Sequence, residues 1–221
     1  MNKDDRISPY YPIFVNIRGE KCLVVGGGIV ALRKVQALLR HGANVTVVSP
    51  VLCPELSQLT KDGAIQVVKR SYKAEDLKNA LLVIAATDDS EANERVAANA
   101  KCRGTLVNVV DIPQCSNFIV PSYFSRGDVA IAVSTSGKSP ALARKIRSQL
   151  EEDFGIEYAQ LALLANEVRS ELKRRGITVD AEAWQEILNL DPLIKLLRDG
   201  KTQEVKNTML NDLKALGQKK S

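Results

Sequence analysis

A glycine-rich turn between an apolar strand and an amphipathic helix constrains this chain more than any other feature. The apolar residues 22–25 run directly into Gly26, Gly27 and Gly28, and a helical pattern follows. A residue without a side chain at the first and third glycine allows a tight turn and a close approach to phosphate, while the small Ala31 lets the helix pack on the strand. Because N–H groups at a helix start attract anions, this spacing predicts a dinucleotide-binding turn.

The strand that follows this helix ends without the usual charged residue. Residues 45–48 are apolar, and they lead into Ser49 and Pro50. Folds of this kind often place an Asp or Glu there to hold the ribose hydroxyls, or an Arg near it to accommodate a 2′-phosphate. The residues alone therefore leave NAD and NADP open.

Strands and helices alternate over the first half of the chain. The apolar runs expected to form strands are residues 22–25, 45–48, 65–68, 81–87 and 106–110. The continuous run 81–87 is typical of a central parallel strand that is buried on both faces. We therefore predict a Rossmann-type α/β domain over residues 1–113. Within it, the apolar residues 10–17 ahead of the first strand are expected to be an edge strand or a cover for the sheet, or simply to pack against the domain, which the residues favour.

The pattern changes after Pro113. Residues 118–121 and 129–134 are expected to be short strands joined through 125–128, and Ser139 with Pro140 is typical of a helix start. We predict a strand-rich dimerisation segment over 114–150, because short strands leave open edges that a second copy can pair.

A helical region is predicted for residues 151–221. Apolar residues recur there at helical spacing, and Asp191 followed by Pro192 predicts an N-cap and a first-turn proline. Trp184 is expected to belong to the core.

Composition narrows the class of partner. The 221 residues carry a net charge of +5, and only 5% are aromatic, so a small polyanion fits better than nucleic acid. No run approaches the ~20 apolar residues of a membrane span, and residues 1–6 are polar, so we expect no membrane association and a cytoplasmic location. The four widely spaced cysteines suit reduced thiols, and a single histidine, His41, argues against a metal site.

Carboxylates follow two of the predicted strands. Asp88 and Asp89 come after Thr87, and Asp111 comes after the strand at 106–110. The ends of parallel strands form the crevice where such sheets bind ligands, so these residues are candidates for chemistry. Each is also a natural helix cap or turn residue, and the residues alone leave both interpretations open.

Several segments together resemble the siroheme synthase family, in the part that carries precorrin-2 dehydrogenase activity. The resemblance rests on residues 26–34, 85–89, 108–111, 117–121 and 136–144, and extends over about 9–152. It implies an NAD-dependent oxidation of precorrin-2 to sirohydrochlorin by a homodimer whose middle segment exchanges between subunits. Some members of the family also insert iron.

The resemblance and the residues together give a set of candidate sites. Asp111 is the catalytic candidate, as the base that takes a proton while the nicotinamide takes a hydride. The cofactor-binding candidates are Gly26, Gly27, Gly28, Ile29, Val30, Ser49, Pro50, Val51, Ala86 and Thr87. The candidates for binding the carboxylate-rich tetrapyrrole are Asn117, Arg126, Ser134, Thr135, Lys138 and Arg144. No metal ligand is assigned.

Two departures and two alternatives accompany this interpretation. Ile112 stands where many relatives have a second Asp, and these 221 residues do not contain the methyltransferase module fused to some relatives, so we expect another protein to make precorrin-2. With His41 expected to cap a helix, we predict dehydrogenation as the main reaction and weak or no iron insertion. The alternatives are a non-catalytic NAD(H)-sensing module and a dehydrogenase of another polyanionic metabolite.

Overall fold

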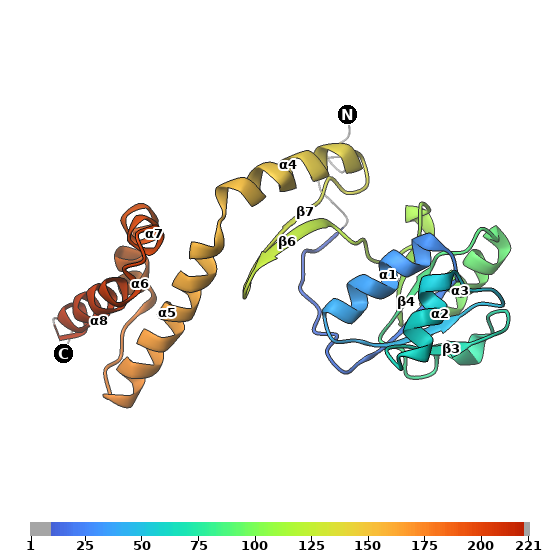
Figure 1. Cartoon of the computed structure of the whole chain (residues 1–221), viewed down its shortest axis with the longest axis horizontal. Coiled ribbons are helices and arrows are strands. Elements are labelled where there is room, and N and C mark those ends of the chain that lie inside the picture. Colours follow the sequence, from blue (N-terminus) through green and yellow to red (C-terminus); the bar gives the residue numbers. More distant parts are fainter. Residues whose placement is uncertain (1–9, 219–221) are drawn as a thin grey trace. The chain divides into compact units, whose positions relative to one another are not determined.

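The computed structural model describes residues 10–218, which form two compact units. The first unit ends at Val120 and the second begins at Pro121. The first contains the parallel sheet and its helices, and the second contains a two-stranded hairpin and the C-terminal helices (Figure 1).

The first unit is built on a five-stranded parallel sheet. Its strands are β1 (Lys21–Val25), β2 (Asn44–Val48), β3 (Gln66–Val68), β4 (Leu82–Ala85) and β5 (Leu106–Val109). They lie in the order β3-β2-β1-β4-β5. All four pairings are parallel, as predicted for a Rossmann-type domain. The connection changes direction between β1 and β4, which places a ligand crevice at the carboxyl ends of these two strands.

Helices cover both faces of the sheet and create two separate cores. The helices are α1 (Ile29–Arg40), α2 (Pro54–Lys61) and α3 (Ser90–Cys102). Cys22 and Val24 of β1 belong to the core that contains residues of α1 and α2, whereas Leu23 and Val25 face the core that contains residues of α3. Burying each such Val or Leu stabilises the fold by about 1.5–3 kcal/mol. The uninterrupted apolar sequence of β1 therefore follows from its burial on both faces.

A partly buried ion pair stabilises the connection between β3 and β4. Arg70 donates two hydrogen bonds to the carboxylate of Asp76, at 2.8 and 2.7 Å, and the Lys73 N–H donates a third at 2.8 Å. Lys21 of β1 donates to the carbonyls of Asp76 and Lys78, both at 2.9 Å. Burial alone would raise the pKa of Asp76, but these donors and the nearby positive charges together hold it below its usual range.

We predict that Asp76→Asn lowers the free energy of unfolding at neutral pH by about 1–3 kcal/mol, because Arg70 loses a charged acceptor. A carboxylate with a lowered pKa stabilises the fold above its unfolded pKa, and this stability disappears as the pH falls toward the folded value. The difference between the two proteins should therefore stay constant from about pH 7 to about pH 5 and shrink as the pH falls further to about pH 3, measured by urea unfolding. A constant difference across this range would contradict the assignment.

Two short segments of the first unit differ from the prediction. Residues 10–17 form no strand, and Tyr11, Ile13 and Phe14 are exposed, so the edge-strand or cover prediction is wrong. Only Ile17 reaches the core, since β1 is already flanked by β2 and β4. Residues 118–121 are also not a strand. The segment meets β5 at Phe118, whose N–H donates to the Val107 carbonyl at 3.5 Å and whose carbonyl accepts from the Asn108 amide at 3.1 Å.

The second unit begins with an antiparallel hairpin. Its strands are β6 (Ser122–Arg126) and β7 (Val129–Val133). The turn is tighter than the predicted 125–128, because Ser125 and Arg126 pair with Ala130 and Val129. Gly127 permits this turn through a positive φ of 57°.

The remainder of the second unit is helical, as predicted. The helices are α4 (Pro140–Asp153), α5 (Ile156–Arg174), α6 (Ala181–Ile187), α7 (Leu190–Arg198) and α8 (Thr202–Gln218). Asn189, and not Asp191, is the N-cap of α7, so that prediction is wrong by two residues. Trp184 is only partly buried and packs against the helical core. In the described part of the chain, no helix is long and apolar enough to cross a membrane.

Candidate functional site

The three glycines of the first turn meet different constraints. Gly26 has a φ of +124°, and a Cβ there would lie 2.2 Å from the Ala86 carbonyl oxygen. A Cβ on Gly27 would lie 1.9 Å from the Val51 carbonyl oxygen. A Cβ on Gly28 would meet no atom within 4 Å. The first two glycines are therefore required by the protein itself, whereas the third leaves open space in front of the helix.

The start of α1 faces this open space with its backbone. Gly28 is the N-cap, no side chain caps the helix, and its first turn holds no acidic residue. The first N–H groups of a helix have no partner within it, and the helix dipole favours an anion there. Ile29 and Val30 are about half exposed at the same end. This arrangement fits a phosphate group beside a partly apolar ligand.

The loop after β2 is locked against the glycine turn. Ser49 is buried, and its hydroxyl donates to the Val51 carbonyl at 2.7 Å. The Cys53 N–H donates to the Gly27 carbonyl at 2.8 Å. These contacts leave Pro50 and Val51 exposed next to the turn. The predicted residues on this loop are thus brought beside Gly27, and Ser49 acts through the loop conformation.

The end of β4 supplies the other wall of the turn. The Ala86 N–H donates to the Val25 carbonyl at 2.8 Å. Thr87 donates its hydroxyl to the Asn93 side chain at 2.9 Å, and the Asn93 amide donates back to the Thr87 carbonyl at 2.9 Å. Asn93 is buried and was missed in the sequence, where it looked like an ordinary helical residue. Asp89 caps α3 through the Ala92 N–H, which confirms its structural role.

Asp111 lies just after the carboxyl end of β5 and has an unusual backbone conformation. It is the third residue of a turn closed by the Ile112 N–H and the Val109 carbonyl at 3.2 Å, and its φ is +61°. Ser116 holds this turn, accepting from the Val109 N–H at 2.9 Å and donating to the Ile112 carbonyl at 3.2 Å. A left-handed conformation is uncommon outside glycine, though Asp and Asn adopt it more readily than most residues. The turn presents Asp111 to solvent.

The amide of Asn117 is engaged by the edge strand of the sheet. The Val107 N–H donates to its side-chain oxygen at 2.7 Å, and its amide donates to the Thr105 carbonyl at 3.1 Å. These bonds satisfy backbone groups of β5 that would otherwise face solvent at the sheet edge. The geometry gives Asn117 a structural role in this edge.

The loop between β7 and α4 is a compact series of turns. The Ser136 N–H donates to the Ser134 hydroxyl at 3.0 Å, and the Ser139 N–H donates to the Thr135 hydroxyl at 3.0 Å. Ser136 and Gly137 both have positive φ, 54° and 81°. Ser139 then caps α4 through the Leu142 N–H at 3.2 Å, as predicted. The hydroxyls of Ser134 and Thr135 therefore fix this loop in place.

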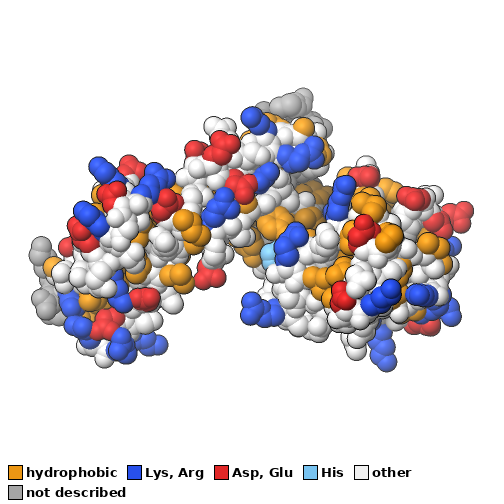
Figure 2. Space-filling model, viewed as in Figure 1, with side chains coloured by type: hydrophobic (Ala, Val, Ile, Leu, Met, Phe, Trp, Pro, Cys, Tyr) orange, Lys and Arg blue, Asp and Glu red, His pale blue; other side chains and the backbone are white. Residues whose placement is uncertain are grey.

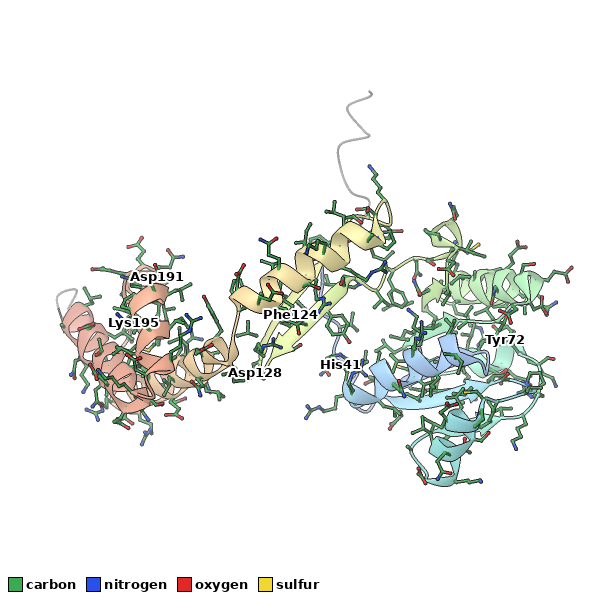
Figure 3. The ribbon with its side chains drawn as sticks, turned by 45° about the horizontal axis from the view of Figure 1, so that its top comes forward. His41, Tyr72, Phe124, Asp128, Asp191 and Lys195 are labelled. Atoms are coloured by element: carbon green, nitrogen blue, oxygen red, sulfur yellow. The ribbon has the colours of Figure 1, made fainter. Side chains whose placement is uncertain are left out.

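The three predicted cations of this unit differ in their partners. Arg126 forms an ion pair with Glu151 at 3.4 Å and lies 5.4 Å from the centre of the Phe124 ring. Phe124 lies where β6 runs beside α4 (Figure 3). Among the described residues, Lys138 and Arg144 have no carboxylate partner. These two charges are therefore available to an anionic ligand.

Neither thiols nor histidine form a metal centre in the described residues. No group of three or more His, Cys, Asp or Glu side chains is arranged there to hold an ion. All four cysteines are free. Burial, with a smaller effect of Glu20, raises the pKa of the Cys22 thiol to about 11, so this residue is a protonated core side chain. His41 is the C-cap of α1 (Figure 3).

Comparisons with known proteins match both units. Residues 13–122 match a family model of NAD(P)-binding domains, and residues 126–152 match one described as sirohaem biosynthesis protein, central. The chain is 45% identical over 181 residues to a siroheme synthase of Nitrosococcus oceani, covering 81% of this chain and 39% of that protein. It is 38% identical over 216 residues to a siroheme synthase of Stutzerimonas stutzeri, covering 95% of this chain and 46% of that protein.

The chain belongs to the siroheme synthase family. It spans about two fifths of the length of these curated relatives. A solved structure, that of SirC, precorrin-2 dehydrogenase, matches 90% of this chain and 98% of its own, with a TM-score of 0.71 and 29% identity. The fold class and the dinucleotide-binding character of the first unit are thereby confirmed, and the cofactor candidates all lie in the NAD(P)-binding match.

We predict opposite effects for substitutions at neighbouring glycines. Gly28→Asp should leave the melting temperature near that of the parent, since a Cβ at Gly28 meets no protein atom, but should abolish dinucleotide binding through clash and charge repulsion. Gly27→Ala should destabilise the fold by about 1–3 kcal/mol, because its Cβ would overlap the Val51 carbonyl. Calorimetric titration with NAD and thermal unfolding measure the two effects. If folded Gly28→Asp bound NAD with the affinity of the parent, the glycine turn would not be part of the dinucleotide site.

Proposed function

We propose that this protein catalyses the NAD-dependent oxidation of precorrin-2 to sirohydrochlorin. The observation that carries the proposal is the open space at Gly28 together with Asp111, which follow β1 and β5 at the carboxyl end of the same parallel sheet, in a chain that resembles SirC along nearly its whole length. A bound nicotinamide supplies the hydride acceptor. NAD is proposed on the family resemblance, since the neutral Ser49 and Pro50 at the end of β2 do not discriminate between NAD and NADP.

In the first unit, one set of residues binds the dinucleotide and Asp111 accepts the proton. The glycine turn and the N-terminus of α1 hold the pyrophosphate through backbone N–H groups, and Ile29, Val30, Pro50 and Val51 offer apolar contacts beside it. Ala86 and Thr87 line the end of β4. Asp111 accepts the proton that leaves the macrocycle, because its carboxylate has no hydrogen-bond partner among the described residues and is exposed at the crevice edge.

The second unit is proposed to recognise the carboxylate groups of the substrate. Lys138 and Arg144 have no carboxylate partner in the part of the chain that the structure describes, and Arg can pair with a carboxylate through two hydrogen bonds. Ser134 and Thr135 shape the loop that carries Lys138. Arg126 contributes by anchoring the hairpin to Glu151, and Asn117 by holding the edge of β5.

Three functional domains and a cytoplasmic location complete the proposal. Residues 1–113 bind NAD, 114–150 form the dimerisation and tetrapyrrole segment, and 151–221 form the helical region. Iron insertion is proposed to be weak or absent, because His41 caps a helix instead of standing at the crevice. An NAD(H)-sensing module would need neither Asp111 nor the free cations.

The decisive experiment follows precorrin-2 and NADH together in one assay. Asp111→Asn should reduce precorrin-2 oxidation by about 10²-fold or more and leave NAD affinity unchanged, since Asn tolerates the left-handed conformation but cannot act as a base. Asp111→Gly removes the backbone strain as well and should be equally inactive yet at least as stable. If Asp111→Asn oxidised precorrin-2 at the rate of the parent, Asp111 would only stabilise the turn and would not act as a base. Binding of NAD without any precorrin-2 oxidation by the parent would favour the sensing module.

A homodimer is expected from the apolar surface of the second unit. Leu142 and Ile146 are exposed four residues apart on α4, so they lie on the same side of this helix. Leu142→Lys should therefore yield a monomer by light scattering, whereas Leu190→Lys, at a similarly exposed leucine of α7, should not. A monomeric parent at micromolar concentration that keeps its activity would rule the dimer out.

A further inference from the structure

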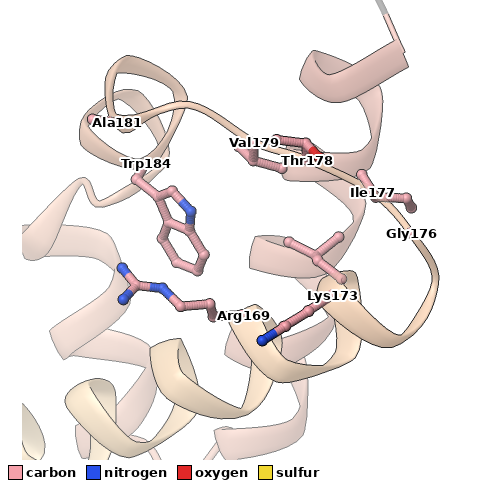
Figure 4. Close-up of a pocket in the computed structure, with 9 residues that line it drawn as sticks. Arg169, Lys173, Gly176, Ile177, Thr178, Val179, Ala181 and Trp184 are labelled. Atoms are coloured by element: carbon pink, nitrogen blue, oxygen red, sulfur yellow. The ribbon is translucent and has the colours of Figure 1, made fainter.

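A groove of about 460 Å³ lies within the helical part of the second unit, where no candidate residue of the proposed function is located. Its lining residues are Arg169, Leu172, Lys173, Gly176, Ile177, Thr178, Val179, Ala181 and Trp184. Figure 4 shows Arg169 and Lys173 rising from one helix, with the loop that leads to α6 and the indole of Trp184 opposite them. The groove therefore combines positive charge with one flat aromatic wall.

Within residues 10–218, no carboxylate forms an ion pair with either cation of this groove. On the same stretch of α5, Arg174 and Arg175 both pair with Glu171. Lys173 has no carboxylate partner among the described residues, and Arg169 instead lies 5.3 Å from the centre of the Trp184 ring. Elsewhere on the helical region basic and acidic side chains are interspersed (Figure 2). The groove is thus a place where positive charge remains unpaired beside an aromatic face.

The opposite wall is preformed. Gly176 ends α5 with a φ of +70°, and the Ile177 N–H donates to the Leu172 carbonyl at 3.0 Å. Ile177 and Val179 pack on the helical core, while Thr178 between them is exposed and lines the groove. Asp180 does not line the groove, because its carboxylate caps α6 through the Ala183 N–H at 2.9 Å. A ligand would therefore meet a fixed wall with one hydroxyl and no carboxylate.

We propose that this groove binds a planar organic anion, an aromatic or conjugated carboxylate that stacks beside Trp184. Its ring would face the indole, and its carboxylate would pair with Arg169 and Lys173, which stand one helical turn apart on the same side of α5. Cation–π and stacking contacts of this kind strengthen as water is excluded. The site is independent of the proposed function, because none of its residues belongs to the cofactor or tetrapyrrole candidates.

The chain offers a direct probe, since Trp184 is its single tryptophan. Titration of the full chain with 1-naphthoate should change the Trp184 fluorescence and give calorimetric binding near one per chain, with a Kd of about 1 mM or tighter. The neutral 1-naphthamide should bind about tenfold more weakly or worse, because it forms no ion pair. Equal binding of the two compounds, or no binding of 1-naphthoate, would overturn the proposal.

Charge-neutral variants locate the site. Arg169→Gln and Lys173→Gln should each weaken 1-naphthoate binding by about fivefold to tenfold, and the double variant by more. Arg174→Gln removes the same charge from the next position on the helix, outside the groove, and should leave the affinity within about twofold. Circular dichroism checks that each variant is folded. Equal losses in Arg174→Gln and Lys173→Gln would show only a general effect of charge and would overturn the site.

Discussion

The contact on which this structure depends is the close approach of the first glycine turn to two neighbouring strand ends. Gly26 lies against the Ala86 carbonyl, and Gly27 lies against the Val51 carbonyl, at distances where no Cβ could fit. Backbone from β1, β2 and β4 thereby converges at one point, and the Cys53 N–H closes it with a hydrogen bond to Gly27. A Cβ at Gly28, by contrast, would meet no atom within 4 Å, so the turn is open at the residue that begins α1.

This convergence explains what the sequence could and could not reveal. The strand, glycine turn and helix at residues 21–40 are local features with clear periodicity, so their positions and the parallel sheet were predictable. The requirement for glycine at position 27 was not predictable, since it arises from the close approach of the Val51 carbonyl, which is remote in sequence. Asn93 was missed for the same reason, because its buried bonds to Thr87 depend on how α3 packs beside β4.

The incorrect predictions share a physical cause as well. Residues 10–17 and 118–121 have the composition of strands, but a strand needs a partner edge. In the first unit β1 is already paired on both sides, and the free edge of β5 is satisfied by the side chains of Asn117 and Ser116. Arg126 was similarly misjudged as a turn residue. Its pairing with Val129 and its ion pair with Glu151 draw it into β6, an effect of residues that follow it in the chain.

Backbone strain adds an independent argument about where function resides. The non-glycine residues with positive φ in the described chain are Asn79, Asp111 and Ser136, and the last two lie in the segments assigned to catalysis and to the substrate. Such conformations cost about 1 kcal/mol or more and persist only where neighbours enforce them. Ser116 enforces the turn at Asp111, and the Ser134 hydroxyl enforces the one at Ser136. Glycine would relax the backbone at both places, so the left-handed conformation of Asp111 supports the proposed role of its carboxylate.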